Sequence, residues 1–332
     1  MRIALVLATI SGIAASSDAP APPRAVKALV IAPTPAELQP WVSHYGLTQA
    51  IAIAGLSPSA PAVLCNADDV CAIATGAGKA NAAATIAALA FCDQLDLSAT
   101  YFVIAELARI DPSVGTIDSA VWVNDVVDAG IAWELDARAL PASWTTGYLG
   151  IGATDPTAPA PIPFGSEHYA IDPALVAKAA SLSSAVALED SDAAKAYRAM
   201  YGSSATPAVL TGATASSDTV WHGALLGQRA HDWVELVAGS GASYATMQQS
   251  DNAALAALTA AGNASRLDAK RAVILHAAWG FDRPHSGQTA YDSLLADPGA
   301  RATSLDNLVV AGAPLVDDIV AHWSAWQTGV PQ

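Results

Sequence analysis

The feature that most constrains the fold is a strand-to-helix joint, IATGAGKANAAATIAALAF, which runs from residue 73 to residue 91. An apolar run leads into Gly76 and Gly78, and Lys79 then opens an alanine-rich segment typical of a helix that ends near Cys92. Glycine allows a sharp turn, and free N–H groups and the positive helix end meet at this point. The joint therefore serves either as a ligand contact or as close packing of helix on strand, and the residues alone leave both open.

Two common phosphate-binding motifs are not completed at this joint. A P-loop needs a glycine five residues before Gly78 and a Ser or Thr after Lys79, where the chain carries Ile73 and Ala80. A dinucleotide-binding fingerprint that starts at the first glycine needs a third glycine where the chain carries Asn81. The joint is therefore more typical of a turn that shapes the fold and the floor of a pocket than of a phosphate cradle.

Strands and helices alternate along the rest of the chain. Strand-like runs cover residues 26–33, 60–65, 70–76, 99–107, 119–135, 207–212 and 271–279, and helix-like runs cover residues 36–46, 172–182, 189–202, 251–262 and 313–326. The stretch from residue 140 to residue 165 carries Pro and Gly and is expected to be irregular. This order predicts an α/β fold, a three-layer αβα sandwich with a central mixed sheet. We expect residues 20–332 to form a single domain.

Charge and the first residues narrow the functional classes. The chain has 332 residues, 15 basic and 30 acidic side chains and a formal net charge of −15, a sign that opposes binding to nucleic acid or to anionic lipid. Residues 1–19 combine one early cation, an apolar stretch and small residues, which is typical of a signal peptide. The alternative is an uncleaved anchor, but the apolar stretch is shorter than the roughly 20 residues that span a bilayer. We expect a secreted or periplasmic protein without a membrane span of its own.

The three cysteines allow one disulfide bond. Cys65 and Cys71 flank turn residues 66–69 between two strand-like runs, so they either face each other across a hairpin and oxidise outside the cytosol or remain buried thiols. Cys92 is expected to be a free thiol on its helix. The Cys and His spacing does not suit zinc, and we predict neither a metal nor a cofactor.

Several separated motifs resemble proteins of the purine nucleoside permease family. The likeness includes TGAGKANAAATIAALAFCDQLDLSATYFVIA, IDPSVGTIDSAVW, ELDARALPASWTTGY, SSDTVWHG, MQQSDNAALAAL and FDRP, and it extends from about Val26 to about Pro284. The resemblance implies a secreted protein that binds purine nucleosides and takes part in their uptake, with delivery to a separate membrane component. A more distant resemblance, to nucleoside phosphorylases and nucleosidases, implies their α/β/α fold, self-association, and cleavage of the N-glycosidic bond as an alternative function.

A nucleoside ligand is expected to contact clusters of polar and aromatic side chains. A purine nucleoside needs a slot for the base, polar contacts to the ribose hydroxyls and a group that stabilises charge on a departing base. The ligand-binding candidates are Gly76, Gly78, Lys79, Ser217, Asp218, Trp221, His222, Gln248, Gln249, Phe281 and Asp282, of which Asp282 and His222 are also the catalytic candidates. Asp218 is suited to sugar hydroxyls, His222 to a purine nitrogen, and the two glutamines to a ribose or a base edge.

Each of these clusters also has a purely structural interpretation. The segment SSDT, with Asp218 in it, is typical of a helix N-cap, and Asp251 after the two glutamines is expected to cap the next helix. His222 fits burial as well as ligand contact. The neighbouring Asp282 and Arg283 are expected to form a salt-bridged turn.

Some positions depart from the pattern that the resemblance implies. Nucleosidase-like relatives have glycines where this chain has Glu106 and Arg109, a glutamate where it has Ser250, and a Ser-Asn or Ser-Asp pair where it has Trp279-Gly280. Loss of a proton donor costs about 10²- to 10⁴-fold in rate, so cleavage would require Asp282 or Glu106 to supply a carboxyl group. An ion pair between Glu106 and Arg109 in a rebuilt pocket is the alternative, which leaves enzymatic activity undecided.

Overall fold

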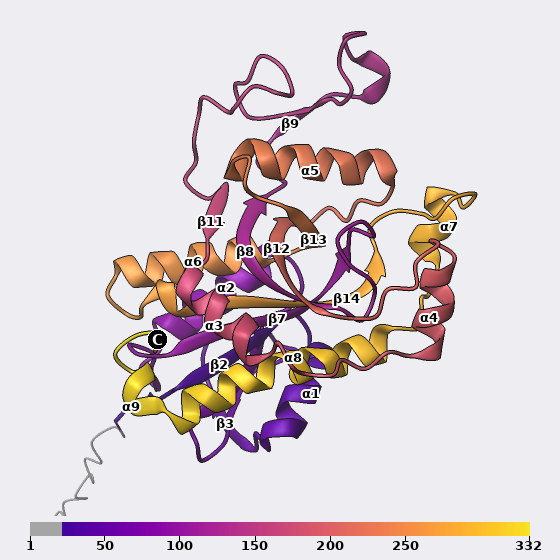
Figure 1. The fold of residues 1–332 in the computed structure, drawn as a ribbon. Helices are drawn as coiled ribbons and strands as arrows, with labels where there is room; N and C mark the ends of the chain where they lie inside the picture. The colour runs from indigo at the N-terminus through magenta and orange to yellow at the C-terminus, as the bar shows by residue number, and fades with distance from the viewer. Residues whose placement is uncertain (1–21) are drawn as a thin grey trace, which may run out of the picture.

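The computed structural model describes residues 22–332, and the expected signal peptide at residues 1–19 lies outside them. A ten-stranded mixed sheet runs through the molecule (Figure 1), with the order β11-β8-β12-β13-β7-β2-β5-β4-β3 and with β14 between β7 and β8. Its strands are β2 (Ala28–Ala32), β3 (Gln49–Ala52), β4 (Ala62–Cys65), β5 (Val70–Ala74), β7 (Tyr101–Ile110), β8 (Ala120–Asp128), β11 (His168–Ala170), β12 (Val209–Ser216), β13 (Tyr244–Gln248) and β14 (Ala272–Phe281). Two short pairs are separate from it, β1 (Arg24–Ala25) with β6 (Leu95–Asp96) and β9 (Trp133–Glu134) with β10 (Tyr148–Leu149).

One part of this sheet closes on itself. Strand β14 pairs in parallel with β7 and antiparallel with β8. Strand β12 pairs in parallel with both β8 and β13. Strand β13 then pairs antiparallel with the last residues of β7, which completes the circuit. The first half of β7 pairs instead with β2, at Ala28 to Ile31. The sequence predicts the mixed sheet correctly but not this closure, because closure depends on which residues of β7 each neighbour pairs with.

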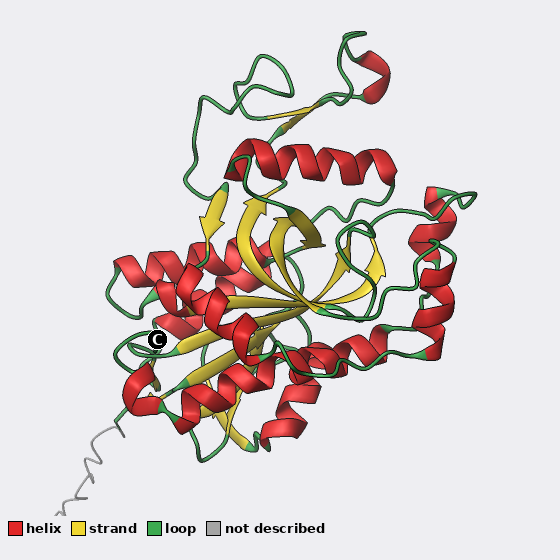
Figure 2. Cartoon of the chain, in the orientation of Figure 1, coloured by secondary structure: helices red, strands yellow, loops and turns green. Residues whose placement is uncertain are grey.

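Helices cover the sheet in layers, as Figure 2 shows. Helices α1, α3 and α8 pack against one face, α2 and α6 pack together against the other, and α5 covers β12 and β13 in the closed part. The helices are α1 (Pro35–Tyr45), α2 (Lys79–Ala90), α3 (Pro173–Leu182), α4 (Asp192–Ala199), α5 (Ala224–Ala238), α6 (Asp251–Asn263), α7 (Ala290–Leu295), α8 (Arg301–Ala321) and α9 (Trp323–Trp326), with short 3₁₀ turns η1 (Ala137–Ala139) and η2 (Ala269–Arg271). The predicted α/β layering with a central mixed sheet is confirmed.

Local signals in the sequence explain where several helices begin and end. Helix α1 starts after Thr34, whose hydroxyl accepts from the backbone N–H of Glu37, and it ends at Gly46 with a positive φ of 57°. Helix α3 starts after Asp172, whose carboxylate accepts from the first-turn N–H groups. Strands β2 and β5 are buried at every residue, since helices cover both faces of the sheet there.

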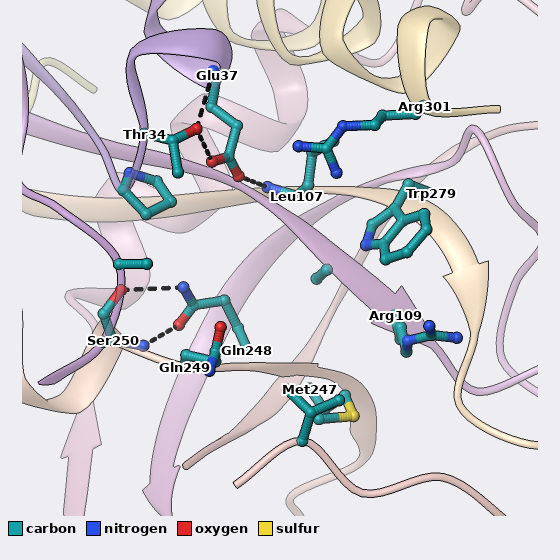
Figure 3. A pocket seen from close by; sticks show the side chains of 15 residues that line it. Thr34, Glu37, Leu107, Arg109, Met247, Gln248, Gln249, Ser250, Trp279 and Arg301 are labelled. Carbon is teal, nitrogen blue, oxygen red and sulfur yellow. Dashed lines mark hydrogen bonds between the residues drawn. The ribbon is translucent and has the colours of Figure 1, made fainter. Parts of the chain in front are cut away.

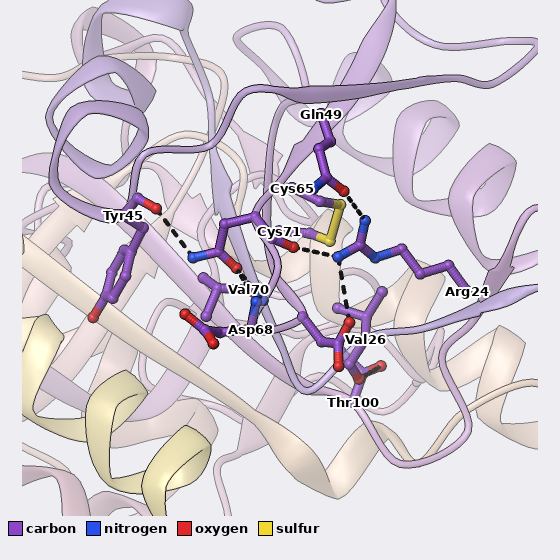
Figure 4. The surroundings of a disulfide bond; sticks show 11 residues. Arg24, Val26, Tyr45, Gln49, Cys65, Asp68, Val70, Cys71 and Thr100 are labelled. Atoms are coloured by element: carbon purple, nitrogen blue, oxygen red, sulfur yellow. Dashed lines mark hydrogen bonds and ion pairs between the residues drawn. A yellow bond between two sulfur atoms is a disulfide. The ribbon is translucent and has the colours of Figure 1, made fainter.

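Cys65 and Cys71 form a disulfide across the β4–β5 hairpin (Figure 4). The two residues are direct partners in the antiparallel ladder, and both are fully buried. In the turn between the strands, Asn66 accepts from the backbone N–H groups of Asp68 and Val70 through its side-chain oxygen. Cys92 is a free, partly buried cysteine that follows α2.

The segment between β8 and β11 projects beyond α5, as the upper part of Figure 1 shows. Within the expected irregular stretch, residues 140–165, the only regular element that the structure describes is the two-residue strand β10. In residues 22–332, no helix combines the length and the apolar character that a membrane crossing requires.

Candidate functional site

A cavity of about 220 Å³ lies where several strands of the sheet end (Figure 3). Its walls come from residues at or just after the carboxyl ends of β2, β5, β7, β13 and β14, from the first turn of α1 and from the first residue of α8. The lining residues are Pro33, Thr34, Glu37, Ala77, Gly78, Leu107, Ala108, Arg109, Val220, Met247, Gln248, Gln249, Ser250, Trp279 and Arg301. In open α/β sheets, the crevice outside the carboxyl ends of the strands is the usual ligand site, so this cavity is the leading candidate.

One buried carboxyl group lines the cavity, and a second lies next to its wall. Glu37 is buried, and its carboxylate accepts from the backbone N–H of Leu107 at 2.9 Å and from the hydroxyl of Thr34 at 2.5 Å. Glu106, next to Leu107 on β7, is 2% exposed. Burial raises the pKa of Glu106 well above its usual value, and the nearby Asp251 and Glu37 carboxylates add to this rise.

A hydrogen-bonded chain links Glu106 to the cavity wall. The hydroxyl of Ser250 lies 3.2 and 3.3 Å from the two Glu106 oxygens and accepts from Nε2 of Gln248 at 3.0 Å. Oε1 of Gln248 accepts from the backbone N–H groups of Ser250 at 2.5 Å and Asp251 at 3.0 Å. Gln248 thus fixes the first turn of α6, and its side chain is held rigidly where the cavity meets the helix.

Asp251 does not cap α6, contrary to the expectation from the sequence. Ser250 is the N-cap residue, and Asp251 is the first residue of the helix and fully buried. Its Oδ2 lies 3.1 Å from Nε2 of His276, but these two atoms are not aligned for a hydrogen bond. His276 Nδ1 pairs with the hydroxyl of Thr246 at 2.9 Å. The side-chain oxygen of Gln248, which accepts from the backbone N–H groups of Ser250 and Asp251, therefore takes the capping role that was expected of Asp251.

Two arginines and a tryptophan also line the cavity. Trp279 lies where the pairing of β14 with β7 shifts by one residue, between Ala278 and Gly280, and such a bulge re-aims a side chain. The guanidinium carbon of Arg109 lies 4.7 Å from the centre of the Trp279 ring, and that of Arg301 lies 5.8 Å from it. Figure 3 shows the Trp279 ring between the two guanidinium groups, with Arg301 reaching toward Leu107.

Glu106 and Arg109 are not an ion pair. They are three residues apart on β7, and side chains an odd number of residues apart in a strand point to opposite faces. Glu106 contacts Ser250, whereas Nη1 of Arg109 donates to the carbonyl oxygen of Phe281 at 3.0 Å. The alternative in which Arg109 neutralises Glu106 is therefore excluded by the geometry.

The glycine turn holds a carboxylate of the protein itself. Gly76 and Gly78 both have φ of 88°, and the backbone N–H of Lys79 donates to Oδ1 of Asp218 at 2.8 Å. Asp218 therefore caps α2 from a loop 139 residues away rather than capping the helix that follows it. Helix α5 starts only at Ala224, after Trp221 and His222, and its N-cap glycine makes no side-chain cap.

Lys79 points away from the glycine turn. Its ammonium group pairs with Oδ2 of Asp128 at 2.7 Å, and Asp128 is 3% exposed. The same oxygen accepts from the side-chain amide of Asn252. Ser217 lies beside this network, where its backbone N–H donates to the carbonyl oxygen of Gln248. These contacts join the β12–α5 loop to the start of α6.

Trp221 and His222 do not line the cavity. Trp221 is 4% exposed and packs in an apolar cluster under α5. Both ring nitrogens of His222 are buried without a hydrogen-bond partner among the described residues. Burial lowers the pKa of His222 to about 4, and the positive charge of Arg109 contributes to this shift. The backbone N–H of Gly223 donates to the carbonyl oxygen of Asp282, so the two candidate segments are neighbours.

Asp282 belongs to a structural network behind the cavity. Its carboxylate accepts from Nε of Arg283 at 2.7 Å and from the hydroxyl of Tyr244 at 3.0 Å, which confirms the expected salt-bridged turn. Arg283 also pairs with the fully buried Asp111, which lies 2.6 Å from Nε2 of His231. Phe281 is buried against Tyr201, with ring centres 4.2 Å apart.

Of the sequence candidates, Gly78, Gln248 and Gln249 line the cavity. Thr34, Glu37, Met247 and Arg301 also line it but were not candidates, since Thr34 and Glu37 carry an ordinary helix-start pattern and Arg301 is far away in the chain. Within residues 22–332, no group of three or more His, Cys, Asp or Glu side chains is arranged to hold a metal ion.

The fold is that of the nucleoside phosphorylase and nucleosidase class. Futalosine hydrolase of Helicobacter pylori superposes with a TM-score of 0.54 at 11% identity, covering 88% of this chain and 98% of that one. The 5′-methylthioadenosine/S-adenosylhomocysteine nucleosidase of Campylobacter jejuni superposes with a TM-score of 0.51 at 13% identity, covering 89% and 99%. At these identities the likeness establishes the fold alone.

The chain belongs to the purine nucleoside permease family, whose family model matches residues 25–331. A Schizosaccharomyces pombe protein described as a probable purine nucleoside permease is 33% identical over 315 residues, which is 90% of each chain. The purine nucleoside permease of Candida albicans is 30% identical over 306 residues, which is 90% of this chain and 75% of that protein. The family expected from the sequence motifs is thus confirmed.

Proposed function

We propose that this protein binds a purine nucleoside in the cavity at the strand ends and takes part in nucleoside uptake as a secreted binding protein. The observation that supports this most is the cavity itself, which combines an aromatic ring, amide side chains and the buried Glu37 carboxyl group within about 220 Å³. That volume lies below the roughly 300–1,000 Å³ of pockets for drug-sized ligands. It therefore favours a ligand no larger than a nucleoside over a dinucleotide.

The lining residues supply the contacts that a nucleoside requires. The Trp279 ring offers a surface on which a base can stack. Gln249 donates through Nε2 to the backbone oxygen of Asp218 at 3.0 Å, which positions its side chain at the cavity wall for a base edge or ribose hydroxyl. Met247 and Leu107 add apolar surface. We assign base stacking to Trp279 and polar recognition to Gln249 and to the Glu37 end.

The proposal that the protein is exported draws on the Cys65–Cys71 disulfide. Disulfides persist in oxidising compartments and are rare in the cytosol. The pattern of residues 1–19 is that of a signal peptide. In this proposal, the protein captures the nucleoside outside the cytosol and passes it to a separate membrane component.

Calorimetric titration of residues 20–332 with adenosine, inosine and guanosine tests the binding proposal. We expect saturable heat with at least one nucleoside and no free base in the mixture. Trp279→Ala should weaken binding by about fivefold or more, since aromatic stacking contributes about 0.5–1.5 kcal/mol beyond burial. Trp133→Ala, at a half-exposed tryptophan outside the cavity lining, is the matched control and should bind normally. Absence of heat with all three nucleosides would refute the proposal.

The alternative function, cleavage of the N-glycosidic bond, is favoured by one observation. Glu106 lies next to the cavity wall, and burial raises its pKa and so favours the protonated form, whose proton a departing base could accept. Asp282 does not fill this role, because Arg283 and Tyr244 hold it outside the cavity. Chromatography of free base, with and without phosphate, distinguishes hydrolysis from phosphorolysis. Glu106→Gln should abolish the release, and unchanged release would exclude Glu106.

A further inference from the structure

We propose that Arg301 is a movable side chain that closes over a bound purine base, so that the base is stacked between the Trp279 ring and the Arg301 guanidinium. This inference rests on the proposed function, because it assigns a further binding residue to the same cavity and the same class of ligand. It also specifies which side of the Trp279 ring the base contacts.

Arg109 covers one side of the Trp279 ring and is held there. Its guanidinium carbon lies 4.7 Å from the ring centre, and the residue is 9% exposed. Nη1 of Arg109 donates to the carbonyl oxygen of Phe281 at 3.0 Å, and Nη2 donates to that of Leu294 at 3.4 Å. Because burial and these two hydrogen bonds fix Arg109, a base cannot stack on this side of the ring.

Arg301 lies on the other side of the ring and is not held in place. Figure 3 shows the Trp279 ring between the two guanidinium groups. Arg301 is exposed, and its side chain takes part in no ion pair or hydrogen bond within residues 22–332. Its backbone is anchored as the first residue of α8, which packs against β14. The side chain can therefore change position while the helix stays where it is.

The separation between Arg301 and the ring is close to what a bound base needs. Stacked planar groups lie about 3.5 Å apart, so a base between the ring and the guanidinium requires about 7 Å. The guanidinium carbon of Arg301 now lies 5.8 Å from the ring centre, which is about 1 Å too close. A rotamer change in a long, exposed side chain supplies this distance without any movement of the cavity wall.

The exchange of partners favours this closure. A guanidinium group is planar and weakly hydrated, and it stacks on aromatic faces. When a base enters, Trp279 exchanges the Arg301 guanidinium for the base, and Arg301 exchanges the Trp279 ring for the outer face of the base. Neither group loses an aromatic partner, and the base gains one partner on each side.

The test is calorimetric titration of residues 20–332 and their variants with adenosine, inosine and guanosine. Arg301→Ala should weaken binding by about fivefold, which corresponds to about 1 kcal/mol of cation–π interaction. Arg301→Lys keeps the charge but not the planar group and should restore only part of the loss. Arg138→Ala is the matched control, since it removes the same charge from a 90% exposed side chain that is absent from the cavity lining.

A double-mutant cycle with Trp279→Ala tells whether Arg301 acts on the stacked base. In that background, Arg301→Ala should weaken binding by less than about twofold, because the ring no longer holds the base beneath the guanidinium. Full additivity of the two losses, full restoration by lysine, or unchanged or tighter binding by Arg301→Ala would overturn the inference and leave the proposed function standing. Failure of all three nucleosides to bind the unaltered protein would overturn both.

Discussion

The disulfide between Cys65 and Cys71 provides the sharpest test of the structure, because its effect on stability can be calculated. The two cysteines are six residues apart in the sequence. In the chain-entropy model, closing a loop of that length removes about 7.4 cal/mol/K from the unfolded state, which corresponds to about 2.2 kcal/mol at 25 °C. The free energy of unfolding should therefore fall by about 2 kcal/mol when the bond is reduced.

Urea unfolding of the same protein with and without a reducing agent measures this difference without removing any atom from the core. Thiol titration in denaturant should find one thiol before reduction, Cys92, and three after it. The double variant Cys65→Ala/Cys71→Ala should lose at least as much stability, because both sulfurs are fully buried, and it should no longer respond to reductant. Cys92→Ala is the control and should keep the response.

The reasoning would be refuted if protein purified without reductant showed three titratable thiols. It would also be refuted if reduction changed the free energy of unfolding by less than about 1 kcal/mol, which is under half of the value that loop closure predicts here. The first result would further remove the structural support for export, since the proposal depends on an oxidising compartment.

Three other predictions concern buried or capping charges. Asp218→Ala removes the acceptor of the Lys79 N–H and should cost about 0.5–2 kcal/mol in urea unfolding, with Asp218→Asn nearer to wild type. His222 has a folded pKa of about 4, below the ordinary 6.5, so stability should be lost as pH falls from 6.5 toward 4, and His222→Asn should flatten this part of the profile. Burial raises the pKa of Asp118 to about 6, so stability should be lost as pH rises from 3.8 through 6, and Asp118→Asn should stabilise the protein more at pH 7 than at pH 4 in the same assay.

Much of the fold could be predicted because its signals are local. The joint from β5 into α2 follows from an apolar run, two glycines and an alanine-rich segment. Asp172 and Thr34 begin their helices as side-chain caps do in general. The closure of the sheet and the cap that Asp218 provides to α2 depend on tertiary contacts over more than a hundred residues, which no local pattern encodes.

The candidate site was predicted less completely for the same reason. Gln248 and Gln249 could be found because amide side chains at the end of a strand are a local signal. At Arg109 and Trp279 the sequence signal was only a departure from the family pattern, which does not place either side chain in the site. Arg301 joins the site because α8 begins beside the end of β14, a placement that residues 290–301 do not reveal on their own.

The departures at Ser250 and Glu106 are better explained as a carboxyl group that has moved to another position than as one that has been lost. From the resemblance, a glutamate was expected at Ser250 and a glycine at Glu106, and the chain has the reverse arrangement of large and small side chains. The Ser250 hydroxyl lies within 3.3 Å of both Glu106 oxygens, so the carboxyl group on β7 reaches the start of α6 where the expected glutamate would begin. The exchange keeps a carboxyl group beside this part of the cavity but buries it, which raises its pKa and favours its protonated form. A neutral carboxyl group can donate to a base nitrogen as well as accept, and binding can therefore persist at a site whose original chemistry has been altered.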